Sequence, residues 1–409
     1  MNPLPKPHSP AIHQRQFHWY LGGLGTWWIS VGLQMVLVPF LVANVLGESP
    51  ERLGIAQMAM VSPALFFMLL AGTLADKIDP RIVLLRIHVL ALIPSLGMAA
   101  LVATGHVTFY AVLVYAFMMG SLGSFHLPSR EAQLNTVVSR DQLQKAVSIT
   151  TAVQFLSQVF GFVLSGMASL IGTFFLFAFQ GLVMILGTWA SWRVSPVEKK
   201  IPDDLASVWT RLREGFSVVR RYPAMRTATL LSFMTGFLFM STLLVTVPLI
   251  NRDIYQGDST SLAQLMVGFF GGLIFASIVL GWVREIVHVG RPLAIFLALG
   301  ACILMLGTMA VPFWVFFLIV FCWGSCTGVF FTLGRAIMQQ SGPESHRARA
   351  ISIFQLGLMG GGPPVGSLMM GFLAGIMGPV QVIYVAGLGM LAVVLVALIA
   401  GIWKLDMGE

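Results

Sequence analysis

The residues of this chain best suited to chemistry are the charged groups of a short polar segment between two apolar runs. Residues 72–81 read Gly-Thr-Leu-Ala-Asp-Lys-Ile-Asp-Pro-Arg. The Asp76 carboxylate directly follows an apolar helix, so it could accept hydrogen bonds from the N-terminus of a neighbouring helix, where the helix dipole favours an anion. It could also form an ion pair with Lys77 or Arg81. The alternative is that these charges only mark the boundary between lipid and water.

A shorter copy of this segment, Gly-Trp-Val-Arg-Glu, begins at Gly281 and is followed by Arg291. Gly72 and Gly281 are 209 positions apart, and so are Asp76 and Glu285. This spacing predicts two related halves, each with an acidic group at the same helix end.

The elements that must position these groups are long apolar runs. The composition is 57% hydrophobic and only 10% charged, whereas soluble chains carry about 25% charged residues. A spanning helix needs about 20 mostly apolar residues. The runs predict twelve spans, at roughly 17–46, 53–75, 82–104, 107–127, 146–171, 173–192, 227–250, 262–284, 292–310, 313–334, 350–376 and 379–403.

The distribution of basic residues predicts the orientation of these spans. When the termini and every second loop are assigned to the cytoplasm, 22 of the 24 Lys and Arg residues fall on that side. Only Arg52 and Arg252 fall on the other side. Cytoplasmic loops are rich in Lys and Arg, so the net charge of +8 is explained without nucleic-acid binding. We expect a multi-pass protein of the inner membrane with both termini in the cytoplasm.

The repeat extends beyond the charged segment and divides the chain. Pro39 and Pro248 are also 209 positions apart, while Ala146 and Ala350 are 204 apart, as expected after a small loop deletion. We expect an N-terminal six-helix half over 1–192 and a C-terminal six-helix half over 227–409. The connecting segment, 193–226, has the pattern of a basic amphipathic helix on the membrane surface.

These motifs resemble the major facilitator superfamily of secondary transporters. The signature of that family between the second and third helices reads Gly-x-Leu-Ala-Asp-Arg/Lys-x-Gly-Arg-Arg/Lys. This chain differs from it at Asp79 and Pro80. The stretches at 127–134, 213–223 and 344–350 are similar to the branch of macrolide-type drug exporters and enterobactin exporters, also described as transmembrane secretion effectors.

The resemblance implies a role for the charged segment and for small residues elsewhere. In the family, the charges hold the outward-open state and separate when the two halves rock. The residues that match by position are Gly72, Asp76, Lys77, Arg81, Glu285 and Arg291. Glycines at close spacing let helices approach and slide, so we expect either hinges or simple close packing at Gly161, Gly166, Gly362, Pro363 and Pro364.

Proton coupling, which the resemblance implies, would require an ionisable group that changes charge during the cycle. All sixteen Asp and Glu residues lie in predicted loops or near helix ends. The candidates for proton binding are Glu131 and His126, near the cytoplasmic mouth of a central cavity. The alternative for Glu131 is a structural ion pair with Arg130 or Lys145.

The substrate site is expected between the halves at mid-depth. Polar, soft and aromatic side chains within the spans could line it, and methionine-rich surfaces suit binding of varied ligands. The alternative is that these side chains face lipid or neighbouring helices. The candidates are Trp28, Gln34, Met35, Met119, Gln154, Phe237, Gln355 and Met359.

Several functional classes have no support in the sequence. It contains no Gly-x-x-x-x-Gly-Lys-Ser/Thr phosphate loop, no metal-ligand cluster and no nucleophile–base set. We therefore expect no cofactor, no bound metal, no nucleic-acid partner and no enzymatic activity. Cys302, Cys322 and Cys326 are interpreted as small packing residues.

The sequence thus predicts an all-α membrane protein with twelve transmembrane helices in two pseudo-symmetric halves. We expect a monomeric exporter of hydrophobic or amphiphilic small molecules, with protons as a coupling ion. One alternative is a dedicated exporter of a native metabolite such as a siderophore, or a lipid flippase. An alternative from another class is a membrane sensor or scaffold that has lost transport.

Overall fold

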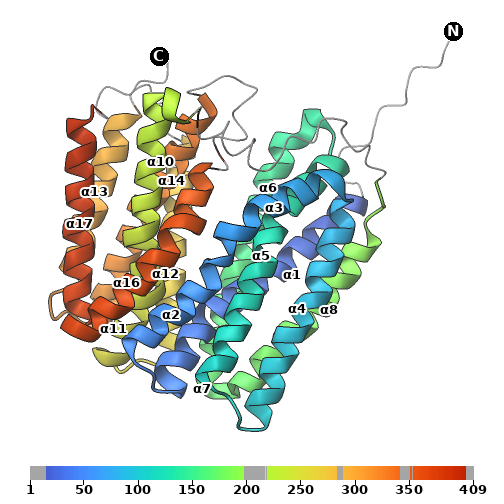
Figure 1. The fold of residues 1–409 in the computed structure, drawn as a ribbon, viewed down its shortest axis with the longest axis horizontal. Helices are drawn as coiled ribbons and strands as arrows, with labels where there is room; N and C mark the ends of the chain where they lie inside the picture. Colours follow the sequence, from blue (N-terminus) through green and yellow to red (C-terminus); the bar gives the residue numbers. More distant parts are fainter. Residues whose placement is uncertain are drawn as a thin grey trace.

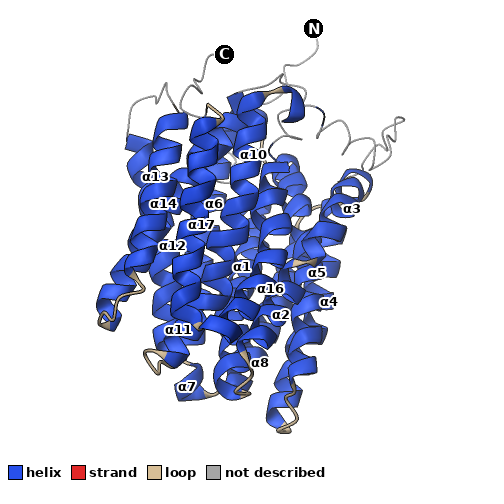
Figure 2. Cartoon of the chain, turned by 60° about the vertical axis from the view of Figure 1, so that its left-hand side comes forward, coloured by secondary structure: helices blue, strands red, loops and turns tan. Residues whose placement is uncertain are grey.

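The computed structural model describes residues 15–197, 217, 219–282, 289–340, 351 and 353–401. Every regular element in these ranges is a helix (Figure 2). The first half contains α1 (Arg15–Phe40), η2 (Leu41–Val45), α2 (Pro50–Val61), α3 (Pro63–Lys77), α4 (Pro80–Ala103), α5 (Phe109–Val137), η3 (Arg140–Gln142), α6 (Leu143–Gly166), α7 (Ala168–Ile171) and α8 (Thr173–Arg193).

The second half follows the same plan and lies beside the first (Figure 1). Its elements are α10 (Pro223–Thr235), η4 (Gly236–Met240), η5 (Thr242–Thr246), α11 (Val247–Asp253), α12 (Ser259–Trp282), α13 (Gly290–Leu306), α14 (Phe313–Gln340), η7 (Leu356–Gly361), α16 (Gly362–Met377) and α17 (Pro379–Ile399).

The predicted number of spans is confirmed, although three of them are shorter or interrupted. By length and composition, nine helices in the described ranges could each cross a bilayer. The other three spans are the 17-residue helix α13, the pair α2–α3 and the pair η7–α16. These twelve spans form the all-α fold of two six-helix halves that the sequence predicts.

Prolines explain where two of the spans are interrupted. Pro63 begins α3 directly after Ser62, because its ring has no N–H to donate and would clash with a preceding helical carbonyl. In the eleventh span, the π-helical turn η7 gives way to α16 at Gly362, and Pro363 and Pro364 occupy the first turn of α16. The change from a π-helical turn to an α-helix therefore falls at the residue before the two prolines.

Asp79 and Pro80, the two departures from the family signature, start α4. The Asp79 carboxylate accepts a hydrogen bond of 3.0 Å from the Arg81 backbone amide, which is the usual role of an N-cap aspartate. Pro80 occupies the first helical position, where a missing N–H has no cost. This pair replaces a flexible glycine with a defined helix start.

The two halves meet in two equivalent helix crossings, α2 with α16 and α6 with α12. A Cβ on Gly54 of α2 would lie 3.0 Å from the Cα of Gly371 on α16, and one on Gly166 of α6 would lie 3.0 Å from the Cβ of Ala263 on α12. Gly54 and Ala263 are 209 positions apart, and Gly166 and Gly371 are 205 apart. The repeat in the sequence is thus also a repeat in the packing of the halves.

Some sequence predictions fall outside the described residues. They include most of the amphipathic connection within 193–226, the carboxylate Glu285, and the side chain of Asp76. The domain boundaries at 192 and 227 remain a prediction, although α8 ends at Arg193 and α10 begins at Pro223.

Candidate functional site

The contact between the halves is polar at the end of the bundle farthest from the start of α1 and the end of α17, which we call the far end. The Nη1 of Arg252, in α11, donates to the carbonyls of Ala43 and Glu48 at 3.3 and 3.0 Å. Asn44 donates in the opposite direction, from Nδ2 to the Gly257 carbonyl at 3.1 Å. These bonds join the α1–α2 connection to the α11–α12 connection.

A second polar contact joins the C-terminal end of α6 to the N-terminal end of α12. The hydroxyls of Ser259 and Thr260 donate to the Gly166 carbonyl at 3.0 and 2.8 Å. The backbone amide of Ser169 donates to the Ser259 hydroxyl at 3.0 Å. The carbonyls at a helix C-terminus lack intrahelical donors, so hydroxyls from the other half satisfy one of them.

We call these residues the far-end seal: Asn44, Gly166, Ser169, Arg252, Gly257, Ser259 and Thr260. Seven hydrogen bonds between described residues join the halves through the seal and the carbonyls that it binds. In Figure 1 the two bundles lie close together around α2, α11 and α16 and diverge toward the termini. The conformation is therefore closed at the far end.

Near the other end, a cationic cluster gathers residues for which the sequence predicted different roles. Arg130 of α5 donates to the Gln154 side-chain carbonyl at 2.6 Å and to the Glu131 carboxylate at 3.1 Å. Its guanidinium also lies over the Trp28 ring, 5.5 Å from the centroid. This Arg130 cluster connects α1, α5 and α6.

The two ions of the cluster differ in exposure. The Arg130 side chain is 11% exposed, while that of Glu131 is 55% exposed. The buried Nε of Arg130 has no hydrogen-bond partner. Water can therefore reach the carboxylate, while the guanidinium is held by the protein. The predicted ion pair between Glu131 and Arg130 is present.

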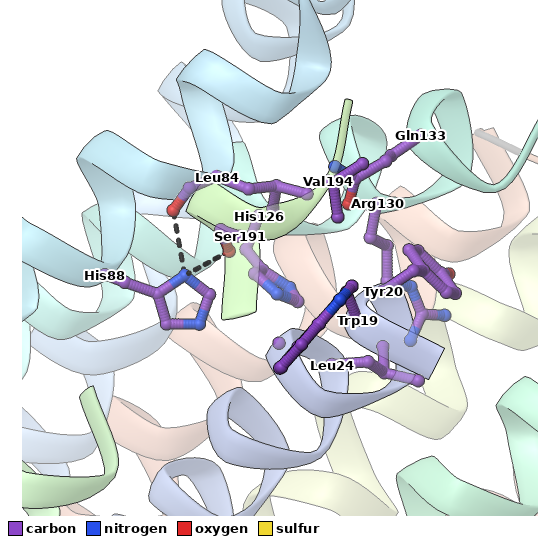
Figure 3. A pocket seen from close by; sticks show the side chains of 11 residues that line it. Trp19, Tyr20, Leu24, Leu84, His88, His126, Arg130, Gln133, Ser191 and Val194 are labelled. Atoms are coloured by element: carbon purple, nitrogen blue, oxygen red, sulfur yellow. Dashed lines mark hydrogen bonds between the residues drawn. The ribbon is translucent and has the colours of Figure 1, made fainter. Parts of the chain in front are cut away.

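His126 does not occupy the position that we expected for it. Its side chain is 2% exposed and stacks on Trp27, with centroids 4.4 Å apart, inside the N-terminal half. The His88 ring lies 6.2 Å away, and its Nδ1 is 2.8 Å from the Leu84 carbonyl. Figure 3 shows His126 and His88 in a pocket among α1, α4, α5 and α8. The expectation that His126 faces a cavity between the halves is therefore wrong.

That pocket is too small for an organic substrate. It has room for about one water molecule. Its polar lining includes Tyr20, Arg130, Gln133 and Ser191 as well as the two histidines. We interpret it as part of the interior of the N-terminal half that supports the Arg130 cluster.

The predicted substrate residues are not gathered in one place. Trp28 and Gln154 belong to the Arg130 cluster. Met119 is 1% exposed and packs in the interior of the N-terminal half, which agrees with the packing alternative rather than with a cavity lining. Met359, in η7, is 47% exposed.

The remaining candidates lie on helices that meet between the halves. Gln34 is buried, with an Oε1 that has no hydrogen-bond partner. Met35 accepts a contact of 3.3 Å from the Gln158 amide to its sulfur. Phe237 stacks on Phe233 with centroids 6.4 Å apart, and Gln355 directly precedes η7.

In the segment of the predicted gate, Arg81 and the neighbouring Asp79 form hydrogen bonds within the N-terminal half. The Nη2 of Arg81 donates to the Trp192 carbonyl at 2.6 Å, near the last turn of α8. Asp79 accepts a bond of 3.1 Å from the Val197 amide. Lys77 ends α3 with an exposed side chain, and Arg291 lies in the first turn of α13. Arg81 therefore satisfies a helix-end carbonyl, a contact that the sequence did not suggest.

The predicted hinge residues divide into two groups. A Cβ on Gly161 would lie 2.9 Å from the Cα of Gly32, and one on Gly362 would lie 2.5 Å from the Phe237 amide nitrogen. Both glycines thus serve close packing inside their own half. Gly166 lies in the seal between the halves, so its close contact joins one half to the other.

Pro363 and Pro364 are buried at the start of α16. The Pro363 carbonyl accepts a hydrogen bond of 3.2 Å from the Ser241 hydroxyl, which ties the eleventh span to the seventh inside the C-terminal half. Sequence reasoning missed this contact, and it also missed Arg252, whose signal was its place outside the cytoplasmic charge pattern.

Two six-helix halves that meet at one end define a transporter of the major facilitator class. The chain belongs to the transmembrane secretion effector family, whose sequence profile matches residues 18–408. It is 21% identical over 367 residues to the uncharacterized MFS-type transporter YfiS of Bacillus subtilis (strain 168), and the match covers 84% of each chain.

Solved structures show the same fold at low sequence identity. The nucleoside transporter NupG matches with a TM-score of 0.76 and 13% identity, covering 95% of this chain and 99% of that one. An auto-inhibited peptide transporter of the POT family matches with a TM-score of 0.73 and 14% identity, covering 97% of this chain and 99% of that one. The protein is therefore a multi-pass membrane protein of a transporter family.

Proposed function

We propose that this protein exports hydrophobic or amphiphilic small molecules across the cytoplasmic membrane by alternating access. The halves 1–192 and 227–409 move against each other as a monomer, with both termini in the cytoplasm. The charge pattern of the loops supports this orientation, since it assigns the far end to the outer side. The closed far end then corresponds to the inward-facing state, in which an exporter collects its substrate.

The far-end seal is the observation that carries the proposal. A polar contact between two halves can break and re-form, because each group it releases can be hydrated when that end opens. A helix interface made only of interdigitated apolar side chains has no such replacement partner. The seal therefore suits a transporter better than a static sensor or scaffold.

The limited charge between the halves supports an apolar or amphiphilic substrate. The two terminal nitrogens of Arg130 already bind the Glu131 carboxylate and the Gln154 side-chain carbonyl, and its guanidinium lies over the Trp28 ring. A strongly anionic substrate would have to displace these contacts. Aromatic and thioether groups such as Phe237 and Met35 suit a range of apolar ligands.

Glu131 is the proposed proton site of the cycle. Its carboxylate is exposed in this conformation and bound to Arg130. The Arg130 guanidinium favours the ionised carboxylate in this inward-facing state, so a bound proton is released to the cytoplasm here. In the outward-facing state the carboxylate would take a proton from the outer side, and burial during the return to the inward-facing state would favour the neutral acid. Proton entry from outside would thereby drive export.

The experiment is transport of fluorescent lipophilic dyes into proteoliposomes, with and without an imposed pH gradient. Wild-type protein should accumulate dye only with the gradient, and Glu131→Gln should retain downhill exchange while losing gradient-driven accumulation. Asp141→Asn, an exposed carboxylate outside the cluster, is the matched control and should behave as wild type. Wild-type protein that moves no dye under either condition would contradict the export proposal.

A further inference from the structure

The two basic residues that break the charge pattern both bind the connection between α1 and α2. Arg52 pairs with Glu48 at 2.6 Å and lies over the Phe109 ring at 5.1 Å, entirely within the N-terminal half. Arg252 comes from the C-terminal half and donates to the Ala43 and Glu48 carbonyls. A basic residue on the outer side opposes the preferred orientation, so each should have a local role.

The bonds of Arg252 and Asn44 run in opposite directions between the halves, and their loop acceptors are equivalent positions of the repeat. Arg252 reaches the carbonyl of Glu48 in the other half. Asn44 reaches the carbonyl of Gly257 in the other half, and Gly257 follows Glu48 by 209 positions. Each half therefore places a donor at the end of its first helix and an acceptor in the loop that follows.

Asp253 fixes the direction in which Arg252 donates. Its two carboxylate oxygens bind Nε and Nη2 of Arg252 at 2.5 and 3.1 Å. This leaves Nη1 for the carbonyls of the other half. A guanidinium bound through two nitrogens has a defined plane. Its remaining nitrogen, Nη1, therefore faces the carbonyls near the end of the first span, where the helix dipole is negative.

The acceptor loop of the C-terminal half is also held in place. Asn251 donates from Nδ2 to the Asp258 carbonyl at 3.1 Å, which closes the loop that carries Gly257. Within that loop, Gln256 has φ of 49° and is the one non-glycine residue of the described chain with positive φ. Such backbone strain persists only where surrounding contacts impose it, and here it presents the Gly257 carbonyl to Asn44.

We propose that Arg252, positioned by Asp253, and Asn44 form a reciprocal latch that sets how often the far end opens. The inference rests on the proposed alternating-access function and adds the residues that control one of its two gates. Both donors must release their carbonyls before α1 and α11 can separate. The latch stabilises the conformation seen here over one that is open at the far end.

The test is the accessibility of a buried reporter from outside the cell. Ser367 on α16 is fully buried, and its hydroxyl has no hydrogen-bond partner, so Ser367→Cys should disturb little. In a background without Cys302, Cys322 and Cys326, a membrane-impermeant maleimide is added to intact cells. Arg252→Gln should raise the labelling rate about tenfold, which corresponds to about 1.4 kcal/mol of latch stability.

Two further variants make the result decisive. Asn44→Leu removes the other half of the latch and should also raise the labelling rate severalfold. Arg52→Gln removes the second outer arginine, which does not cross between the halves, and should leave the rate unchanged. Unchanged labelling in both latch variants, or an equal rise in Arg52→Gln, would overturn the proposal. Because labelling needs no substrate, it distinguishes failure of the latch from failure of the export proposal.

Discussion

Arg130 is held by three kinds of contact, and each constrains a different part of its side chain. A carboxylate and an amide oxygen bind its two terminal nitrogens, and an indole lies against its face. The sequence suggested Arg130 only as a partner of Glu131. Trp28 and Gln154 were predicted to bind substrate because they are polar or aromatic groups within spans. Their contacts with Arg130 depend on how α1, α5 and α6 pack together, and spacing along the sequence does not predict that packing.

Arg130→Lys tests the geometry of the Arg130 cluster. Lysine keeps the charge but cannot donate two parallel hydrogen bonds or lie flat on an indole. We expect the initial rate of gradient-driven dye transport to fall at least tenfold at equal amounts of inserted protein. Arg86→Lys, at an exposed position on α4, is the control and should keep the wild-type rate. A wild-type rate in Arg130→Lys would mean that only the charge matters.

Asp258 provides a pH test of the far end. Its burial alone would raise the pKa of the carboxyl, but hydrogen bonds from the Ser261 amide, the Ser169 hydroxyl and Thr260 outweigh that effect and lower the pKa. A lowered pKa means that the stabilisation is fully present above the ordinary range and is lost as pH falls through the folded-state pKa. The stabilising effect of the charge should therefore disappear in acid.

The Asp258 carboxylate accepts from the backbone amides of Thr260 and Ser261 and so caps the start of α12. Asp258→Ala should lower the melting temperature at pH 7, since loss of an N-cap costs about 1 kcal/mol. The difference from wild type should shrink as pH falls below about 4, where aspartate protonates. Thermal unfolding in detergent between pH 7 and pH 3 measures this difference. Asp258→Asn keeps an acceptor without the charge and should show a smaller difference at pH 7. A constant gap between Asp258→Ala and wild type across this range would contradict the assignment.

The helices themselves were the most predictable part of the structure. The length of an apolar run identifies a span without reference to its neighbours. Twelve runs were therefore recognised, even though Pro63 splits the second span and the eleventh begins with the π-helical turn η7. The π-helical turns η2, η4 and η5 left no clear signal. The seal was unpredictable for a different reason: most of its acceptors are backbone carbonyls, those of Ala43, Glu48, Gly166 and Gly257. Every residue carries a backbone carbonyl, so the sequence does not distinguish the carbonyls that are bound, and only the fold shows them.

The crossing of α2 with α16 depends on the absence of a side chain at Gly54. A Cβ there would lie 2.7 Å from the Ser367 carbonyl oxygen, so the helices would have to separate. We expect Gly54→Ala to destabilise the closed far end by about 1 kcal/mol or more. Outside labelling of Thr246→Cys, a buried position on η5, should then rise at least about fivefold.

Gly97→Ala is the control for this substitution. Gly97 also lies within a long helix, but a Cβ there would meet no atom within 4 Å. Its labelling rate should equal that of the reporter alone. Equal effects of the two substitutions would show that helix propensity, rather than the contact between halves, is responsible.

At the scale of the whole molecule, the two halves repeat both their sequence and their contacts. The crossings α2–α16 and α6–α12 use equivalent positions, and the latch uses equivalent loops. The polar parts differ, because Ser259 of the second half corresponds to Pro50 of the first, 209 positions earlier. Pro50 has no hydroxyl to donate, so the hydroxyl contacts exist only at the α6–α12 crossing. Opening the far end should therefore require more hydrogen bonds to break at the α6–α12 crossing than at the α2–α16 crossing.

The central claim is that transport requires the far end to open. The hydroxyls of Ser169 and Ser259 lie 2.7 Å apart across the halves, so Ser169→Cys with Ser259→Cys should form a disulfide on oxidation. In a protein without the native cysteines, we predict that this cross-link abolishes dye transport in proteoliposomes and that a reductant restores it. Each single cysteine should be insensitive to oxidation. Undiminished transport by fully cross-linked protein would contradict the account.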